Sequence, residues 1–445
     1  MNRFLSRFFI VLAILSAAFA LSFAYYLDRL EAGSGFHSRI VWLMLGGFLF
    51  LAVAAWRFPL KAKFLIFALI LTFVSVELLL QTAGWLGVLP GVNTKLRVPF
   101  GRIYWSSEGH SNSIRNRFGW NYPAFDLQAA HRIAFIGDSQ VEALEVPCTR
   151  NQAACLQGLL RKKGPDWAVL GLGSHGTCPA HSIEVLEYAA RHLKPQEVFL
   201  FVSIGSDIIE ASPLLNGYPP DRFLYYDLAS DGSLVLNPAS AQVRDLFNRT
   251  LELHHSSVLG SLPMILISHC MTLQVAMSFR DSLALRKRQA EFARQASKLQ
   301  RKEGEEYQRL GFNPAPFAVD PEPEARRAMA VLLAQIQHCN DLCKTQRATM
   351  RLVTLPSFPK AFYDSQSGTN WTMHLGSYDY LAPERALVAF AATNQIPVLA
   401  LGDAIRSKNF SVEEIRSLYF SDGVGHLTEK GHRFCAEAIY NAFYR

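Results

Sequence analysis

Hydrophobic residues gather in three long runs at the start of the chain and in shorter runs after residue 130. The long runs cover residues 8–26, 40–56 and 64–80. Each is close to the roughly 20 apolar residues that cross a bilayer as a helix. The pattern therefore predicts three transmembrane helices, with a single carboxylate, Glu77, in the third.

Charges beside these runs predict their orientation. Two arginines precede the first run, and three basic residues at 57–63 separate the second from the third. The positive-inside rule places both groups in the cytoplasm, so we expect everything after the third run on the periplasmic side of the inner (plasma) membrane. A signal peptide cleaved after Ala18-Phe-Ala20 or Ser22-Phe-Ala24 would leave the same final topology, but the length of the first run and the spans that follow favour an uncleaved anchor.

After residue 131 short apolar runs alternate with amphipathic stretches. The runs have no helical spacing and are typical of strands buried on both faces: 132–137, 167–171, 197–203, 350–356 and 397–401. The amphipathic stretches predict helices at about 150–162, where Thr149 is the expected cap, 179–193, 322–344, 382–395 and from about 428 to 443. This alternation predicts an α/β domain with a parallel sheet.

We divide the chain into a membrane anchor (1–90), an extracytoplasmic leader (91–131) and an α/β domain (132–445) with a helical insertion at about 211–320. Within the insertion, we expect turns and short strands at 211–250. The apolar stretch 258–277 is expected as an amphipathic or buried helix near the substrate cleft or the membrane surface, and the charged stretch 278–311 as a solvated helix.

Charge distribution and cysteine spacing argue against two classes of protein, those that bind nucleic acids and those that bind zinc through cysteines. The net charge of +7 is spread along the chain apart from a charged stretch at 286–310, and no nucleic-acid motif is present, so we expect no nucleic-acid partner. The seven cysteines form no zinc-binding pattern. An extracytoplasmic location permits disulfides, and Cys148 and Cys155 are the closest candidate pair.

Candidate chemistry begins with Gly137-Asp138-Ser139, directly after the first predicted strand. Ligands of open α/β sheets bind beyond the carboxyl ends of the strands, so Ser139 is the candidate nucleophile. A serine needs an adjacent base that is held by a third group. His426 is the candidate base, and Asp422, four residues earlier, is the candidate orienting acid. The backbone N–H groups of Ser139 and Gly176 are candidate oxyanion donors.

Other assignments remain open. Asp138 and Ser139 also suit an ordinary capped turn. His432 is a rival base, although its place on the last helix favours packing, and Asp403 is a rival acid. The rival nucleophile is Ser174 in Leu172-Gly-Ser-His-Gly176, which nearly matches the nucleophile elbow of α/β-hydrolases but has leucine at the first glycine.

Four blocks in order resemble the SGNH (GDSL-like) hydrolase superfamily over roughly 132–445. They are Gly137-Asp-Ser139, Gly176, Ile204-Gly-Ser-Asp207 and the segment from Asp422 to His426. The resemblance implies a three-layer α/β/α, flavodoxin-like sheet with Ser139, Asp422 and His426 as the triad. It also implies an oxyanion hole from Ser139, Gly176 and the third block, and no cofactor or metal.

Two departures from the family pattern bear on activity. Ser206 stands where the family has an oxyanion asparagine, and Asn151 is a possible substitute donor. The spacing from Asp422 to His426 is one residue longer than usual, with two glycines inside it that would let the loop bulge.

The leader segment 112–123 also looks like what precedes the serine block in membrane-anchored bacterial members. Those members are often associated with surface polysaccharides, as O-acetyl esterases or acetyltransferases. Interleaved aromatics suit either a sugar platform or the cover of a sheet face: Tyr104, Trp105, Trp120 and Tyr122. We therefore expect a membrane-anchored serine esterase or acyltransferase for acyl groups on cell-surface carbohydrate, with membrane-protein partners of polysaccharide export. The alternatives are a catalytically silent glycan-binding or scaffold protein and a lipid-directed esterase.

Overall fold

The computed structural model describes residues 3–12, 14, 53, 58–88, 98–256, 265, 267–276, 279, 313–368, 371–420 and 425–445. Most of the first two predicted membrane helices and of the charged stretch 278–311 lies outside these residues. Asp422 lies outside them as well.

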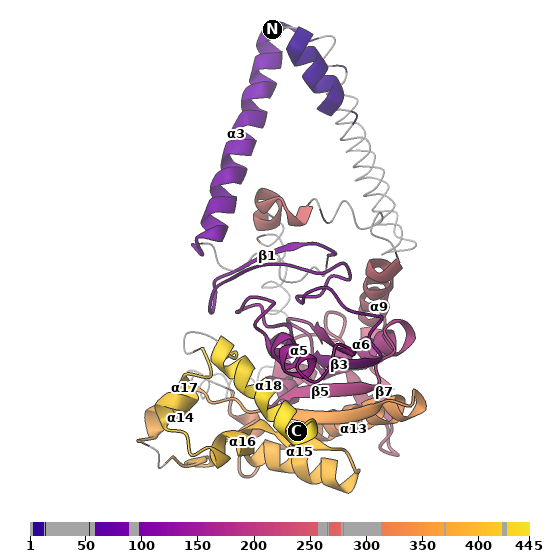
Figure 1. Ribbon diagram of the computed structural model, residues 1–445, viewed down its shortest axis with the longest axis vertical. Coiled ribbons are helices and arrows are strands. Elements are labelled where there is room, and N and C mark those ends of the chain that lie inside the picture. Colours follow the sequence, from indigo (N-terminus) through magenta and orange to yellow (C-terminus); the bar gives the residue numbers. More distant parts are fainter. Residues whose placement is uncertain are drawn as a thin grey trace.

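The third apolar run forms the long helix α3 (Leu60–Trp85), which projects away from the sheet domain (Figure 1). Its most apolar window has a mean hydropathy of 2.3 and is not buried by the protein. Among the described residues it is the one helix long and apolar enough to cross a membrane. Residues 3–12 are helical too, and Leu5 and Phe9 pack against the Ile66–Ile70 side of α3.

Hydrogen bonds tie the end of α3 to the segment around residue 271 and to the leader hairpin. The Glu77 carboxylate accepts from the backbone N–H groups of Met271 and Thr272 at 2.7 and 2.8 Å. The Gln81 amide donates to the carbonyl of His269 and accepts from the Tyr104 hydroxyl. The stretch expected near the cleft or the membrane surface is therefore attached at the base of α3.

Five parallel strands form the central sheet: β3 (His131–Gly137), β4 (Trp167–Gly173), β5 (Glu197–Ser203), β8 (Thr349–Leu355) and β11 (Val398–Ala400). Their order, β11-β8-β5-β3-β4, is the flavodoxin-like order. The predicted α/β class with a parallel sheet is confirmed. Side chains such as Phe135 and Phe199 are fully buried, which explains why the strands read as continuous apolar runs.

Helices pack on both faces of the sheet, and the main ones are α5 (Gln152–Arg161), α6 (Pro179–His192), α13 (Pro323–Thr345), α15 (Ala382–Thr393) and α18 (Glu429–Phe443). Helix α18 lies against α5, and α13 lies against α6. The expected ranges are correct to within about two residues at each end. The predicted cap Thr149 is wrong, because Asn151 caps α5 by accepting from the N–H of Ala154.

The insertion after α7 (Ile204–Glu210) contains more helix than the sequence suggested. It comprises α8 (Pro213–Asn216), the hairpin β6 (Tyr226–Leu228) and β7 (Leu234–Leu236), η1 (Pro238–Ser240), α9 (Ala241–Ser256) and η2 (Ala315–Phe317). Turns and short strands were expected up to residue 250, but α9 occupies the last part. Its few buried apolar residues, Leu251 and Leu253 among them, are diluted by charged ones, so the helical pattern was weak.

The smaller elements complete the part of the domain that follows β8. They are α14 (Lys360–Ser365), β9 (His374–Leu375), β10 (Tyr378–Asp379), α16 (Leu401–Ser407) and α17 (Val412–Arg416). All seven cysteines are free thiols, so the candidate disulfide between Cys148 and Cys155 is not formed.

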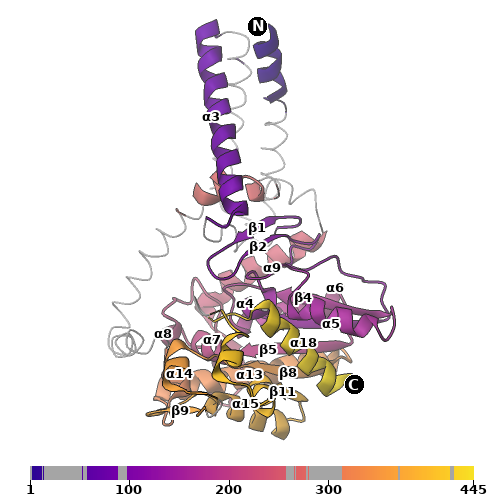
Figure 2. The same cartoon turned by 60° about the vertical axis from the view of Figure 1, so that its left-hand side comes forward.

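The leader forms a hairpin, β1 (Arg102–Trp105) and β2 (Ser111–Ile114), that lies between the lower end of α3 and the sheet domain in both views (Figures 1 and 2). Its four aromatic candidates are all buried: Tyr104, Trp105, Trp120 and Tyr122. Of the two interpretations, the open sugar platform is therefore wrong. Trp120 and Tyr122 belong to the main hydrophobic core of the sheet domain, which fits the covering role, whereas Tyr104 packs with Met271 and Leu80, and Trp105 with Ile103 and Leu144.

Gly173, at the end of β4, has no room for a side chain. A Cβ there would lie 2.0 Å from the backbone nitrogen of Glu142. We expect Gly173→Ala to destabilise the fold by about 3 kcal/mol, the upper end of ordinary overpacking costs, measured by thermal unfolding in detergent. Gly158→Ala is the matched control, because a Cβ at Gly158 meets no atom of the described residues within 4 Å. Equal melting temperatures for the two variants would contradict this prediction.

Candidate active site

Ser139 stands at the carboxyl end of β3, where the strand order of the sheet reverses between β3 and β5. It begins the short helix α4 (Ser139–Glu142), which Asp138 caps by accepting from the N–H of Gln140 at 3.0 Å. The helix ends at Ala143, whose φ of 53° is left-handed. This tight turn leaves Ser139 partly exposed, while Asp138 behind it is buried.

His426 faces Ser139 from the loop before α18. Its Nε2 lies 2.8 Å from the Ser139 Oγ, and the residue is only 4% exposed. Gln140, next to the serine, holds the same loop, because its amide donates to the carbonyl of Gly425 and accepts from the N–H of Leu427. The two residues predicted as nucleophile and base are thus brought together.

The other imidazole nitrogen contacts Glu108, a residue that the sequence analysis missed. Glu108 Oε2 lies 2.5 Å from His426 Nδ1. The second oxygen, Oε1, accepts from the backbone N–H groups of Gly425 and His426 at 2.9 and 3.0 Å. One buried carboxylate therefore holds both the ring and its loop, and Gly425 adopts a φ of 86° that favours glycine there.

The leader hairpin positions Glu108. The residue lies in the turn between β1 and β2, where the Trp105 indole donates to the Glu108 carbonyl at 2.8 Å. At the end of the turn, the Ser111 hydroxyl donates to the carbonyl of Leu144 at 2.5 Å. These contacts fasten the turn to the loop that follows α4, and so carry the Glu108 carboxylate to the histidine.

Neither acid named from the sequence occupies this position in the part of the chain that the structure describes. Asp422 lies outside the described residues. Asp403 is exposed on α16 and pairs with Arg406 at 3.5 Å, so it is not the partner of the imidazole. No short-range signal marks Glu108, because it stands 318 positions before His426 in the chain.

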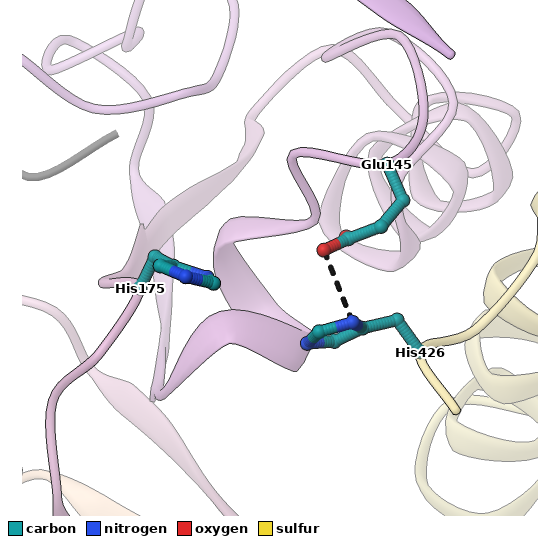
Figure 3. A group of neighbouring side chains, drawn as sticks. All are labelled: Glu145, His175 and His426. Carbon is teal, nitrogen blue, oxygen red and sulfur yellow. Dashed lines mark ion pairs between the residues drawn. The ribbon is translucent and has the colours of Figure 1, made fainter. Parts of the chain in front are cut away.

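A second carboxylate, Glu145, lies beside the same imidazole. Its Oε1 is 3.2 Å from His426 Nδ1, its side chain is fully buried, and neither oxygen has a hydrogen-bond partner among the described residues. Figure 3 shows Glu145 and His175 directed toward His426.

Burial and charge shift the pKa values of these groups. Burial alone would lower the pKa of His426, but the carboxylates of Glu145 and Glu108 raise it to about 9. Burial raises the pKa of Glu145 to about 7 even though the His426 charge opposes it. For Glu108 burial acts upward too, yet the hydrogen bond and charge of His426 hold its pKa below the usual value. A buried imidazole between two carboxylates is a strong base.

The candidate oxyanion donors differ in availability. Gly176 is exposed with a φ of 66°, and a Cβ added to it would meet no atom within 4 Å among the described residues. The Ser206 hydroxyl on α7 instead points to Asp138 Oδ2 at 3.5 Å, the outer limit of a hydrogen bond. Asn151 is buried, caps α5 and donates to the carbonyl of Asn121, so it is not a substitute donor.

The rival catalytic residues, His432 and Ser174, are both buried in the protein. His432 on α18 is fully buried, and burial lowers its pKa to about 3, so it is a neutral packing residue. Ser174 is buried, its N–H donates to the carbonyl of Gly137, and its own carbonyl accepts from the Thr177 hydroxyl. It is Ser139 that contacts the imidazole of His426.

Comparison with known proteins finds no matching family model and no matching curated protein. Similar solved structures include TesA, at 12% identity and a TM-score of 0.34, which covers 71% of this chain and 98% of TesA. An acetyl xylan esterase, AlAXEase, matches at 13% identity and a TM-score of 0.33, covering 70% of this chain and 99% of the esterase.

A G-D-S-L family lipolytic protein from Desulfitobacterium hafniense DCB-2, described as putative, is also similar, at 10% identity and a TM-score of 0.32, with coverage of 70% and 99%. Because these TM-scores are low, we draw no conclusion about function from the similarities.

Proposed function

We propose that this protein is a membrane-anchored serine esterase or acyltransferase of the SGNH type. The observation that carries the proposal is the continuous contact from Ser139 Oγ through both nitrogens of His426 to the Glu108 carboxylate. A serine that contacts a histidine, which in turn contacts a buried acid, is the arrangement that activates a hydroxyl for attack on an ester.

The reaction would run through an acyl-serine intermediate. Ser139 Oγ attacks the ester carbonyl as His426 Nε2 takes its proton, and Glu108 stabilises the imidazolium that forms. The N–H groups of Ser139 and Gly176 would receive the oxyanion, with Ser206 able to join only by leaving Asp138. His426 then returns the proton to the leaving alcohol, and water or another hydroxyl takes the acyl group from the serine.

The same contacts weigh against a catalytically silent protein. A scaffold or glycan-binding domain has no need for a partly exposed serine in hydrogen-bond contact with a buried imidazole, which is in turn held by a buried acid. The missing asparagine at Ser206 removes one oxyanion donor, a loss of about 3–4 kcal/mol of transition-state stabilisation in enzymes that use one. Two backbone donors remain candidates.

For the substrate we propose an acyl group, such as acetyl, on cell-surface carbohydrate, on the periplasmic side of the inner membrane. The sequence resemblance of the leader and the long apolar helix α3 support this proposal. Interaction with membrane proteins of polysaccharide export is part of the same proposal. A lipid-directed esterase is the second candidate, because Leu273 and Val275, beside the base of α3, expose apolar side chains.

The deciding experiment is covalent labelling of the detergent-solubilised full chain with a fluorophosphonate. We expect the wild type to label and both Ser139→Ala and His426→Ala to remain unlabelled while keeping the wild-type melting temperature. Acyl release from acetylated oligosaccharide and from phospholipid then separates the two substrate classes. An unlabelled, folded wild type would contradict the proposal and favour the silent alternative.

The reaction rate should depend strongly on pH. His426 must be neutral to accept the serine proton, and its pKa is raised to about 9 by Glu145 and Glu108 against the effect of burial. The labelling rate of free enzyme should therefore rise up to tenfold per pH unit from neutrality and level off near pH 9. Labelling reactions that are quenched at successive times, at a series of pH values, measure the labelling rate as a function of pH. A plateau already reached at pH 7 would contradict this expectation.

A further inference from the structure

Three side chains around the candidate base have the composition and spacing of a transition-metal site. Potential ligand atoms of Glu145, His175 and His426 all lie within 4.8 Å of one another (Figure 3). Imidazole and carboxylate together suit Zn²⁺, which binds nitrogen and oxygen at about 2.0–2.2 Å. Two ligands of one tetrahedral ion are then about 3.4 Å apart, so a pair at the 4.8 Å limit has to approach by about 1.4 Å to close the group.

Two of these side chains lack the hydrogen bonds that buried polar groups normally make. Both oxygens of Glu145 and the Nδ1 of His175 are buried without a hydrogen-bond partner in the described part of the chain. Leaving such groups unsatisfied is costly. The 3.2 Å between Glu145 Oε1 and His426 Nδ1 already matches the separation of two ligands on a tetrahedral ion.

We propose that Glu145, His175 and His426 form an inhibitory site for Zn²⁺. The Glu108 carboxylate, hydrogen-bonded to the same Nδ1 at 2.5 Å, would become a fourth ligand after moving about 1 Å away from that nitrogen, and two carboxylates would balance the charge of the ion. Such an ion would inhibit rather than catalyse, because it would bind Nδ1, the ring nitrogen that faces away from Ser139.

The inhibition follows from the proton on the imidazole and rests on the proposed function. In the working state the ring proton is on Nδ1, facing Glu108, and Nε2 has a free electron pair for the serine proton. When zinc binds Nδ1, that nitrogen uses its electron pair for the metal and the ring proton moves to Nε2. The ring stays neutral, but Nε2 can no longer accept a proton from Ser139.

The test measures zinc binding and serine reactivity separately. Equilibrium binding of Zn²⁺ to the full chain in detergent is compared for the wild type, Glu145→Gln, His175→Phe and Ser139→Ala. His175→Phe keeps a ring against Trp105, which His175 contacts edge-on. We expect Ser139→Ala to bind like the wild type and the two ligand variants to bind at least about tenfold more weakly, since even losing a residue that supports a ligand has this effect.

Fluorophosphonate labelling of each protein with and without Zn²⁺ gives the second result. Saturating zinc should stop labelling of the wild type, a chelator should restore it, and Glu145→Gln should need at least about tenfold more zinc for the same effect. Unchanged zinc affinity in both ligand variants, or a wild type that labels fully at saturating zinc, would overturn the proposal. If the wild type does not label even without zinc, the proposed function fails, while the binding comparison still decides the metal site.

Discussion

Replacing Glu108 with glutamine should lower the turnover rate about 10,000-fold, the effect of neutralising the acid in a serine triad. The two backbone N–H groups of Gly425 and His426 need an oxygen acceptor at the Oε1 position. Glutamine has one oxygen, so its NH₂ group would face His426 Nδ1. That arrangement favours the imidazole with its proton on Nε2, which cannot take the proton of Ser139.

The comparison with Asp422→Asn makes this result decisive. Asp422 is the acid that the sequence suggests, and the two substitutions remove the same charge from different positions. Steady-state ester hydrolysis and melting temperature are measured for both variants. A large loss of rate in Asp422→Asn with normal activity in Glu108→Gln would contradict the assignment of Glu108.

Replacing Arg115 with methionine should lower the free energy of unfolding by about 3–5 kcal/mol. Arg115 Nη1 lies 2.5 Å from Glu142 Oε1, and the two side chains are 0% and 1% exposed. Removing the arginine leaves a buried, unpaired carboxylate. Glu142 also accepts from the N–H of His175, so the damage should reach the turn that carries Gly176.

An exposed pair gives the matched control. Arg150 and Glu429 also form a salt bridge, at 2.7 Å, but their side chains are 61% and 39% exposed. Arg150→Met should cost less than about 1 kcal/mol, because water screens an exposed pair. Denaturant unfolding of both variants in detergent measures the difference. The prediction fails if the two substitutions destabilise equally, or if adding Glu142→Gln to Arg115→Met restores no stability.

The features that the sequence predicted correctly depend on local patterns. A strand such as β5 is buried on both faces and therefore reads as an unbroken apolar run. The partly exposed Ser139 directly follows β3, at the carboxyl edge where open sheets bind ligands. Ser139 and His426 could be named as candidates because each lies in a short polar motif at the end of an element. Their meeting at 2.8 Å follows from the topology of the sheet.

The residues that escaped prediction owe their roles to distant parts of the chain. Glu108 is an isolated acid between a serine and a glycine, and only the docking of the leader turn buries it against the loop of His426. Trp120 and Tyr122 were ambiguous for the same reason, because an aromatic side chain that covers a core and one that stacks on a ligand have the same local sequence. Burial by a remote segment leaves no periodic signal.

The position of Glu108 also shows that the candidate site extends beyond the sheet domain into the leader hairpin. The acid belongs to the segment that connects α3 to the sheet, whereas the serine and histidine belong to the sheet domain itself. A recombinant fragment that started at β3 would retain the complete five-stranded sheet with Ser139 and His426 and yet lack the carboxylate that contacts the imidazole. Fusion or exchange of this domain between proteins would have to carry the β1–β2 hairpin along with it.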